Sequence, residues 1–542
     1  MASVAPVPAT APAAPLAAAN ARRKLRVGVF ADSPLQPRWI VEALAKVAAC
    51  DFAELAVVCI AETCTRYTFL PKRVPGTGFG LTPIYRALDE RVFGSPSSLP
   101  ADVTQLVPAS RRLALCDPVP QLDVAVALGD ILDGDLAGVA RCGVWRFSFG
   151  DDHHTDEGRA GVHEVASQSH VTASGIRIHL GNGQGDRVAC ASWARTQPFS
   201  VSQNRANVFA KSTEFLARAL RDLHDQGWTW IEQGTTPAPA MAPATAAIPA
   251  TQVARIGTRL VHRAVQKFSS VDQWVLGFRF AAEEGWDSIA SFTRLDPPKD
   301  RFWADPFPIQ VNGRSYIFFE ELPFAAGRAH ISVVEVSPDG SVSQPVPVVE
   351  RDYHLSYPFL VEDRGELFMI PESAANHSIE IYRCVDFPYR WKREKVLVEG
   401  VWCADATVYR QGERWFMFAN SAPNYAEIHD ELHLYTASAL LGDWKPMRRN
   451  PVKSDARCSR PAGALFREGD ALYRPAQICA PLYGSGIVVN RVTRLDENGF
   501  QEEEARRILP VEGSGILGVH TMNRAGTLSV TDFFVRRRRF GA

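Results

Sequence analysis

Carboxylates stand at unusual places in the second half of this 542-residue chain. Asp405 interrupts an apolar stretch, WCADATVY, and Asp305 precedes a proline between aromatic residues in RFWADPFPIQ. Burial of an unpaired carboxylate in an apolar strand destabilises the fold. A carboxylate at such a position is therefore expected to be paired or functional. Cleavage of a glycosidic bond requires two carboxyl groups, one protonated and one ionised. The carboxylates that we predict as catalytic candidates are Asp305, Asp405, Glu372 in IPES and Glu320 in FFEE.

Hydrogen-bonding side chains accompany these carboxylates. They stand at the starts of corresponding strands or in short motifs such as SRP and YRPAQ, where they can orient a substrate. Arginine beside a carboxylate favours the ionised form and also suits an anionic sugar or a phosphate leaving group. The residues that we predict to bind substrate are His354, Tyr357, Arg460, Arg474, Gln477, Tyr483 and His520.

Structural roles compete with this interpretation. Asp305 before a proline can cap a turn, and Glu372 can pair with an arginine without reacting. His354 and His520 can be packing or hydrogen-bonding histidines. For Asp405, the alternative is a carboxylate that is paired for structural reasons, because the stretch around it is apolar.

Two further acidic features have simpler readings. Of the paired glutamates at the end of FFEE, we expect Glu320 in the site and Glu321 in solvent. The cluster DDHHTDE, Asp151 to Glu157, lacks the i, i+4 histidine pair of a helical metal site. We therefore predict no metal ligands.

A repeated unit positions the candidate residues. It consists of a small or polar residue, an Asp or Pro, a short strand, a turn with glycine and an aromatic strand, and it recurs five times between residues 301 and 534. Units of this length with further strands between them are typical of propeller blades. We predict an all-β five-bladed propeller over residues 274–535, which WVLGFRF at 274–280 closes with an outer strand. The alternative is an irregular sandwich.

The first half alternates strands and helices. KLRVGVFAD, FAELAVVCIA, QLDVAVALG and CGVWRFSFG read as strands, and PRWIVEALAKVAAC reads as a helix with one apolar face. A hairpin and a long amphipathic helix that starts near Ser202 follow. This order predicts an open α/β sheet over residues 25–231 with a ligand crevice at the carboxyl ends of its strands.

Composition sets the boundaries between these parts. An Ala/Pro-rich stretch predicts a flexible linker at 232–252, and helical spacing follows at 253–273. The Ala/Pro-rich residues 1–24 predict a disordered tail and not a signal peptide, and RRRR within 536–542 predicts a solvated basic tail.

Charge and cysteine usage restrict the class of protein. The formal net charge is −1, so a general nucleic-acid partner is not expected. The ten cysteines contain no CxxC pair, which favours reduced thiols and a cytoplasmic location. No apolar run is long enough for a transmembrane helix. The sequence does not indicate the oligomeric state.

The motifs WADPFPI, HLSYPFLVEDRGELFMIPES, DATVYRQGERWFMF, SRPAGALF, YRPAQ and GVHTMN carry a resemblance. They resemble the propeller domain named for plant glucosamine inositolphosphorylceramide transferases, which is similar to the five-bladed propellers of arabinanases, β-xylosidases and fructosidases. In the plant proteins, a separate domain transfers the sugar, and this chain shows no candidate for it. The resemblance to the glycosidases implies that Asp305 is a base or nucleophile and that Asp405 tunes pKa values. No motif matches their acid, which leaves Glu372 and Glu320 as candidates.

The first half looks like a folate-dependent formyltransferase in GVWRFSFGD, SGIRIHLGNGQGDRVA and the helix from Ser202. In that family, an Asn, a His and an Asp perform the chemistry. Arg146 and Ser148 stand where the Asn and His would fall, Gly183 replaces the catalytic Asp, and Asp186 matches a second Asp of the motif. A base for the attacking amine is therefore missing. We predict a degenerate formyltransferase-like domain, one that keeps the fold without the activity.

Together these observations predict a cytoplasmic carbohydrate-active protein. It would transfer or hydrolyse glycosyl groups in the synthesis of a surface polysaccharide or glycolipid, with a possible sugar-nucleotide donor and no other cofactor. A carbohydrate or glycolipid would be its substrate. The alternatives are a glycan-binding scaffold without catalysis and a formyltransferase that acts on an amino sugar.

Overall fold

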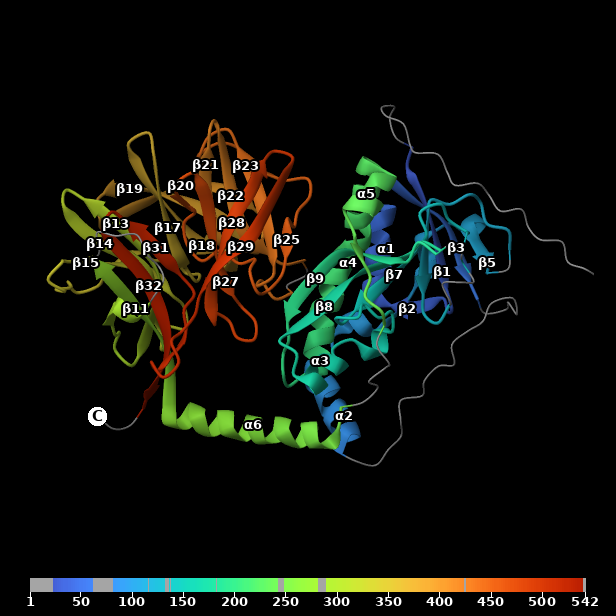
Figure 1. Ribbon diagram of the computed structural model, residues 1–542, viewed down its shortest axis with the longest axis horizontal. Coiled ribbons are helices and arrows are strands. Elements are labelled where there is room, and N and C mark those ends of the chain that lie inside the picture. The colour runs from blue at the N-terminus through green and yellow to red at the C-terminus, as the bar shows by residue number, and fades with distance from the viewer. Residues whose placement is uncertain are drawn as a thin grey trace, which may run out of the picture.

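The computed structural model describes residues 23–61, 81–115, 117–131, 136, 138–181, 183–241, 248–280, 289–423 and 426–539. Two units lie side by side, an α/β domain and a β-propeller, and one long helix runs between them (Figure 1). Of the predicted disordered tail at residues 1–24, residues 1–22 lie outside the described residues, and Arg23 donates hydrogen bonds to Asp123. Among those that are described, no helix is both long enough and apolar enough to cross a membrane.

The α/β domain is built on an eight-stranded sheet of order β10-β9-β8-β7-β6-β1-β3-β5. The strands β5, β3, β1, β6 and β7 are parallel, and β8, β9 and β10 extend the sheet in antiparallel fashion. Their bounds are β1 (Leu25–Ala31), β3 (Ala53–Ile60), β5 (Arg112–Ala114), β6 (Val124–Leu128), β7 (Val144–Phe149), β8 (Val171–His179), β9 (Asp186–Arg195) and β10 (Thr236–Pro237). The predicted open α/β sheet and its hairpin are confirmed.

Helices cover this sheet. The apolar face of α1 packs with α4 over the buried strands, and the ring of Trp39 lies between those of Phe147 and Phe209. Ser200 caps α4 by accepting a hydrogen bond from the backbone of Gln203. The elements are α1 (Arg38–Ala48), α2 (Leu81–Phe93), α3 (Val162–Ser167), α4 (Val201–Gln226) and α5 (Trp228–Gln233), with a small sheet of β2 (Leu35–Pro37) and β4 (Pro100–Asp102).

The connection between the domains is more ordered than the sequence predicts. Within the expected flexible linker, β10 pairs with β9 and α5 ends at Gln233; residues 242–247 lie outside the described residues. The connecting helix, α6, runs over Ala250–Ser269 and not over 253–273. It ends early because residues 270–273 belong to a strand of the propeller.

The propeller has five sheets, one for each predicted unit. Blade 1 contains β13 (Arg301–Val311), β14 (Arg314–Pro323), β15 (His330–Val336) and β16 (Val346–Val349). Blade 2 contains β17 (Ser356–Asp363), β18 (Glu366–Ser373), β19 (Ser378–Asp386) and β20 (Arg390–Glu399). Blade 3 contains β21 (Cys403–Gln411), β22 (Arg414–Ser421), β23 (Glu431–Ala437) and β24 (Lys445–Pro446), with β25 (Lys453–Ser454) beside β23. Blade 4 contains β26 (Phe466–Glu468), β27 (Ala471–Ile478), β28 (Gly486–Asp496) and β29 (Gly499–Ile508).

Both ends of the propeller sequence build blade 5. Its strands are β31 (Met522–Ala525), β32 (Leu528–Arg538), β11 (Ser270–Phe280) and β12 (Thr293–Leu295), with β30 (Ile516–Gly518) also paired to β32. β11 pairs with β32 along its whole length, from Ser270 opposite Arg538 to Phe280 opposite Leu528. The ring is thus closed by the segment that contains WVLGFRF, as predicted, but this segment is not the outer strand, because β12 pairs with its far side.

The same pairing corrects the prediction of a basic tail. Arg536 and Arg537 belong to β32; Arg536 pairs with Asp272, and Arg537 donates to Gln273 and to the carbonyl of Pro297. Arg539 donates to the carbonyl of Ser270. The arginine run is therefore a strand end, because each residue finds a partner on β11 or beside it.

Buried charges join the two domains. The ammonium of Lys211 on α4 has no solvent exposure and lies 2.7 Å from Asp430, just before β23. The guanidinium of Arg218, two turns further along α4, makes two hydrogen bonds of 2.8 and 3.1 Å to Glu431. Loss of one partner in such a pair leaves an uncompensated buried charge, so the interface is fixed in position.

Candidate active site at the propeller mouth

The first strands of blades 1, 2 and 3 share one irregularity. Each slips in register at the same place, and the residue at the slip has a left-handed backbone: φ is 51° at Asp305, 44° at Tyr357 and 56° at Asp405. This conformation costs about 1–3 kcal/mol for such residues and is concentrated at functional sites. Each of the three side chains contacts another blade. The bulges thus bring three distant parts of the chain together.

Asp405 is the most strongly bound carboxylate of this group. Its Oδ2 accepts hydrogen bonds from Arg460 Nε at 2.6 Å and Gln477 Nε2 at 2.8 Å, and its Oδ1 accepts one from Arg460 Nη2 at 3.2 Å. Asp405, Arg460 and Gln477 are all buried. The bidentate pair with Arg460 fixes the orientation of the carboxylate and the guanidinium.

Glu372, on β18, lies between this pair and the surface. Its Oε2 is 3.5 Å from Arg460 Nη2, and its side chain is 16% exposed against 1% for Asp405. Burial raises the pKa of Glu372 well above its usual range, and the neighbouring carboxylate of Asp405 raises it further; Arg460 offsets only part of this. The carboxyl group nearest to solvent is therefore the one that holds its proton at neutral pH.

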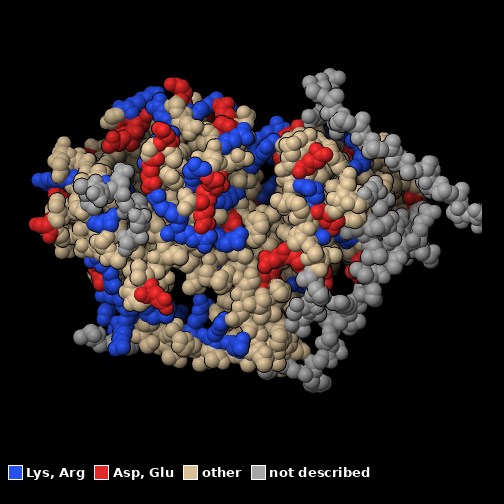
Figure 2. Space-filling model, viewed as in Figure 1, with Lys and Arg blue, Asp and Glu red and all other residues tan. Residues whose placement is uncertain are grey.

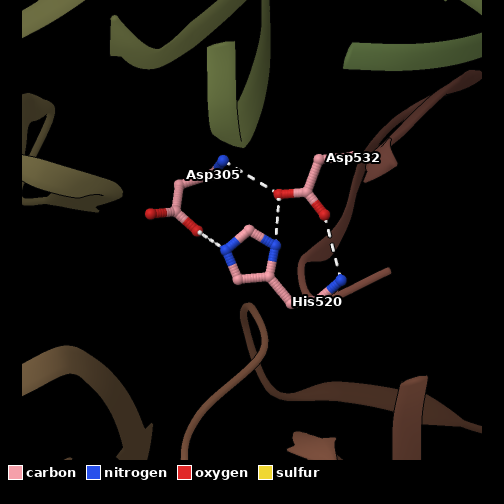
Figure 3. Close-up of side chains that lie close together, drawn as sticks. All are labelled: Asp305, His520 and Asp532. Carbon is pink, nitrogen blue, oxygen red and sulfur yellow. Dashed lines mark hydrogen bonds and ion pairs between the residues drawn. The ribbon is translucent and has the colours of Figure 1, made fainter. Parts of the chain in front are cut away.

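Asp305 heads a second group, which includes His520 and Asp532 (Figure 3). His520 Nε2 lies 3.3 Å from Asp305 Oδ1, and His520 Nδ1 lies 2.8 Å from Asp532 Oδ2. The hydroxyl of Thr521 donates to Asp305 at 2.7 Å, and the backbone amide of Tyr357 donates to the other oxygen at 3.3 Å. The imidazole is therefore held between two carboxylates.

The protonation of this second group departs from ordinary values. Burial raises the pKa of Asp305 to about 7; Glu320, Asp405 and Asp532 add to the effect, and His520 opposes it. Burial alone would lower the pKa of His520, but the carboxylates of Asp532 and Asp305 outweigh it and raise that pKa to about 9. At neutral pH, the imidazole is consequently protonated and Asp305 can exchange a proton near pH 7.

Asp305, His520 and Asp532 also offer ligand atoms that lie within 4.8 Å of one another, a spacing that could hold a metal ion. A histidine binds a metal through an unprotonated nitrogen. Because both nitrogens of His520 face carboxylates and its pKa is raised, the residues fit a proton better than a metal.

Aromatic rings form the wall beside His520. The ring centroid of Trp274 on β11 is 3.9 Å from that of His520, and Tyr483 is 5.3 Å from both His520 and His429. The guanidinium of Arg460 lies over the ring of Tyr483. Such a surface suits the apolar face of a sugar ring.

His429 reaches the site from the segment that the α/β domain holds. Its Nδ1 is 3.2 Å from Arg460 Nη1, and burial, together with Arg460 and Arg195, lowers its pKa well below the usual range. Arg195 and Gln197 of the α/β domain bind Glu427 on the same segment. The α/β domain therefore positions one wall of the propeller mouth.

The paired glutamates at the end of β14 have different environments. Glu320 Oε1 lies 3.1 Å from His354 Nε2, and this carboxylate outweighs burial to raise the pKa of His354. Glu321 is 2% exposed and accepts hydrogen bonds from Arg301, Trp303 and Ser332. The expectation that Glu321 lies in solvent is wrong, because both faces of an inner strand are covered by neighbouring blades.

Arg474 is not part of the cluster. It binds Glu502 and donates to the carbonyls of Cys458 and Ser459. It is three residues from Gln477 on β27, and residues an odd number apart lie on opposite faces of a strand. Since Gln477 faces Asp405, Arg474 faces away and has a structural role.

The other predicted residues meet at the mouth. Tyr357 is fully buried; its hydroxyl lies 2.8 Å from that of Thr407 and accepts a hydrogen bond from the backbone of Gly463. The sequence did not identify Asp532, Thr521, Trp274 or His429. Asp532 had a usable signal, since it is a lone acidic residue in the apolar stretch SVTDFFV.

A cleft of about 700 Å³ opens beside this cluster, between α6 and the propeller. Trp274 and Tyr483 belong to both the cleft and the aromatic wall. Figure 2 shows Lys and Arg side chains around the opening above α6. The charged residues that line the cleft are Arg195, Arg263, Lys267, Arg536, Arg539 and Asp272.

The polar residues on β7, β8 and β9 of the α/β domain are arranged differently. Arg146 donates to the carbonyl of Gly129, and Ser148 lies 3.1 Å from His153. Asp186 pairs with Arg177 at 2.6 Å and with His179 at 2.7 Å, and these hydrogen bonds outweigh burial to lower its pKa. Arg146 and Ser148 supply no general base here. The resemblance of this domain to formyltransferases remains a prediction.

The fold and site define a two-domain protein: an open α/β domain joined to a five-bladed propeller with a buried carboxyl cluster at its mouth. Residues 288–515 match the sequence model of the family described as glucosamine inositolphosphorylceramide transferase 1, N-terminal. The resemblance predicted from the propeller motifs is confirmed.

Similar proteins match part of the chain. Glucosamine inositolphosphorylceramide transferase 1 of Arabidopsis thaliana is 31% identical over 220 residues, which are 40% of this chain and 29% of the relative. The protein of the same name from Oryza sativa subsp. japonica is 28% identical over 205 residues, 37% of this chain and 27% of the relative. The chain thus spans less than a third of the length of these relatives.

Among solved structures, Zg3597, a family 117 glycoside hydrolase of Zobellia galactanivorans, is 14% identical with a TM-score of 0.32, covering 49% of this chain and 90% of the hydrolase. The α-L-arabinofuranosidase PaAbf62A of Podospora anserina is 9% identical with a TM-score of 0.33, covering 49% of this chain and 97% of that enzyme.

Proposed function

We propose that the propeller mouth is the active site of a carbohydrate-active enzyme that transfers or hydrolyses glycosyl groups. The observation that carries the proposal is the pair formed by Glu372 and Asp405. One of these carboxyl groups has a raised pKa and reaches solvent, and the other is fixed by Arg460 and Gln477. A carboxyl group that holds its proton at neutral pH and reaches solvent can act as a general acid.

In this proposal, Glu372 is the general acid and donates its proton to the glycosidic oxygen as the bond to the anomeric carbon breaks. Asp305 is the general base and takes a proton from the attacking water or acceptor hydroxyl, which forms the new bond. Asp405 touches Glu372 and keeps its proton in place, because a second negative charge beside it is unfavourable. His520 accompanies Asp305 and stabilises its ionised form.

The surroundings favour a substrate that carries negative charge. The cleft beside Trp274 has five cationic side chains and one acidic one, Asp272, along its walls. Arginine and lysine bind phosphate and carboxylate groups. The named relatives are transferases of an inositolphosphorylceramide, which also supports a glycolipid or a sugar nucleotide as a substrate of this chain.

The biological setting belongs to the same proposal. We place the reaction in the synthesis or tailoring of a surface polysaccharide or glycolipid, in the cytoplasm. The eight cysteines that the structure describes as free are consistent with reducing conditions, because no disulfide links them.

The test is turnover of the full chain on a panel of aryl glycosides and sugar nucleotides, for the wild type and for Glu372→Gln. The expected result is turnover in the wild type and a loss of about 10²–10⁴-fold in the variant. A chain that binds glycans without turning over any of them would instead be a binding module. Binding of a formyl-folate by the α/β domain, with N-formylation of an amino sugar, would favour the formyltransferase alternative.

A further inference from the structure

Helix α6 is exposed along most of its length. Gln252 and Ile256 near its start are buried against the α/β domain, and residues 257–263 are all exposed. It contacts α2 at one end and β11 at the other, and Figure 1 shows it running free between the two domains. A helix in this position is expected to present polar residues all round.

One side of α6 is instead apolar. Leu260, Val261, Val265 and Phe268 are 49%, 65%, 59% and 79% exposed. They are spaced so that Val261 and Val265 are four residues apart and Leu260 and Phe268 eight, which places them on one face. Exposed large apolar residues that are contiguous mark an interaction surface.

Helix α2 extends the same kind of surface. Ile84, Leu88 and Val92 repeat every fourth residue and are 60%, 57% and 66% exposed. In Figure 1, α2 lies at the end of α6 at the same edge of the molecule. The two helices contact each other, and we call their exposed apolar residues the apolar ridge, defined as Ile84, Leu88, Val92, Leu260, Val261, Val265 and Phe268.

Cations form a second row on α6. Arg255, Arg259, Arg263 and Lys267 recur at every fourth position, and the helix has no Asp or Glu from Ala250 to Ser269. At 100° per residue, this row lies away from the apolar stripe and meets its border at Lys267. Arg263 and Lys267 face the cleft beside the propeller mouth.

We propose that the apolar ridge docks this protein onto an anionic lipid bilayer surface. A helix with an apolar face and a basic polar face lies in the plane of the membrane interface, where the negative potential of anionic headgroups attracts the basic side chains. The positive charge of α6 indicates which partner the apolar ridge binds. A second copy of the chain would bring two cationic helices together, whereas an anionic bilayer buries the apolar residues and attracts the cationic ones. The proposal is independent of the proposed function.

Docking in this way places the propeller mouth close to the membrane. The cleft lies on the polar side of α6, and its aromatic wall contains Trp274 and Tyr483. The bilayer surface would therefore lie one helix diameter, about 10 Å, from the cleft. Headgroups of membrane lipids would be within reach of Lys267 and Arg539.

The experiment is sedimentation of the full chain with vesicles of phosphatidylcholine alone or with 30% phosphatidylserine. We expect at least tenfold stronger partitioning onto the anionic vesicles, and weakening by 0.5 M salt. Val261→Asp and Phe268→Asp should each lower partitioning at least tenfold. The matched control is Val385→Asp. Val385 is also an exposed valine, 49% accessible, but it lies on β19 of blade 2, outside the apolar ridge.

The row of cationic residues on α6 is tested with two triple variants, one on α6 and one control in blade 2. Changing Arg255, Arg259 and Lys267 to Gln should abolish the preference for anionic vesicles, whereas the same change at the exposed Arg364, Arg390 and Lys392 of blade 2 should not. Equal thermal midpoints across all variants exclude unfolding as the cause. Equal or absent binding to both vesicle types overturns the proposal. So does self-association in solution that Phe268→Asp abolishes, since the ridge would then bind a second copy.

Discussion

The β8–β9 hairpin of the α/β sheet and the mouth of the propeller both gather charged side chains, but they balance them differently. On the hairpin, Asp186 is matched by Arg177 and His179, and its pKa is lowered. At the propeller mouth, within the described part of the chain, carboxyl groups outnumber cationic groups. Five carboxyl groups, Asp305, Glu320, Glu372, Asp405 and Asp532, surround Arg460 and two histidines with raised pKa values, His354 and His520.

The difference separates a structural site from a reactive one. A carboxylate that accepts hydrogen bonds from an arginine and a histidine, as Asp186 does, is stabilised in its ionised form and is poorly suited to proton exchange. Where acids outnumber cations in a buried space, some must hold protons at neutral pH, as the raised pKa values of Glu372 and Asp305 indicate. Such groups are suited to proton transfer.

The strongest test of this contrast compares carboxamide variants in the two regions. Asp305→Asn and Glu372→Gln should each lower kcat by about 10²–10⁴-fold, because each removes a proton-transfer group. Asp186→Asn should leave kcat within about twofold. The pH profile of the wild type should rise through about pH 7 as Asp305 ionises. Steady-state rates on the best substrate of the panel measure all of these.

The contrast fails if Asp186→Asn lowers kcat as much as Asp305→Asn does while the fold is intact by circular dichroism. That result would move the chemistry to the α/β domain and revive the formyltransferase alternative.

The second test removes the buried ion pair between Lys211 of the α/β domain and Asp430 of the propeller. Lys211→Met leaves Asp430 buried without its cation, which should cost about 3–5 kcal/mol of unfolding free energy. Asp430 already has a pKa raised by burial to about 6, despite Lys211. Urea unfolding of the variant should show the loss, and adding Asp430→Asn to it should restore part of the stability.

An outcome in which Lys211→Met is as stable as the wild type would show that water reaches Asp430 and that the domains move apart readily. The role of the α/β domain in positioning His429 would then be wrong.

The third test concerns pH and stability. Folded His520 has a pKa of about 9 and the unfolded residue one near 6.5, so its contribution to stability is complete below pH 6.5 and is lost as the pH rises through 9. The loss should reach about 3 kcal/mol. Urea unfolding followed by tryptophan fluorescence at pH 6.5 and 9 measures it.

In His520→Gln, this part of the pH dependence should disappear. An unchanged slope in that variant would mean that another group titrates over this interval and that the charge balance at the mouth is misassigned.

The sequence predicted the propeller better than it predicted the roles of single residues. The repeated motifs yielded five blades and the closing segment because each unit carries its own turn and strand pair. Asp405 was found because charge within an apolar strand is unusual, and Arg460 because it stands at the start of a repeated unit. Asp532 carries the same signal as Asp405, but His520 was the residue predicted from the fifth unit.

The errors have a common physical cause. Glu321 and Arg474 were judged from composition, whereas their positions depend on which strand face they occupy and on both faces being covered by neighbouring blades. His429 and Trp274 lie outside the repeated motifs, so only the folded chain brings them to the site. Pairing of the arginine run with β11 is likewise a long-range contact.

The smallest expected effect concerns a hydroxyl that ties blades together. The Tyr357 hydroxyl bonds to Thr407 of blade 3 and accepts from the amide of Gly463, just before blade 4. Tyr357→Phe leaves that buried amide unsatisfied, which should cost about 2 kcal/mol. In the α/β domain, Thr172→Val removes one bond, to the hydroxyl of Thr196, and should cost about 1 kcal/mol. Urea unfolding compares them, and a larger loss for Thr172→Val would contradict the view that the propeller mouth is the more tightly coupled region.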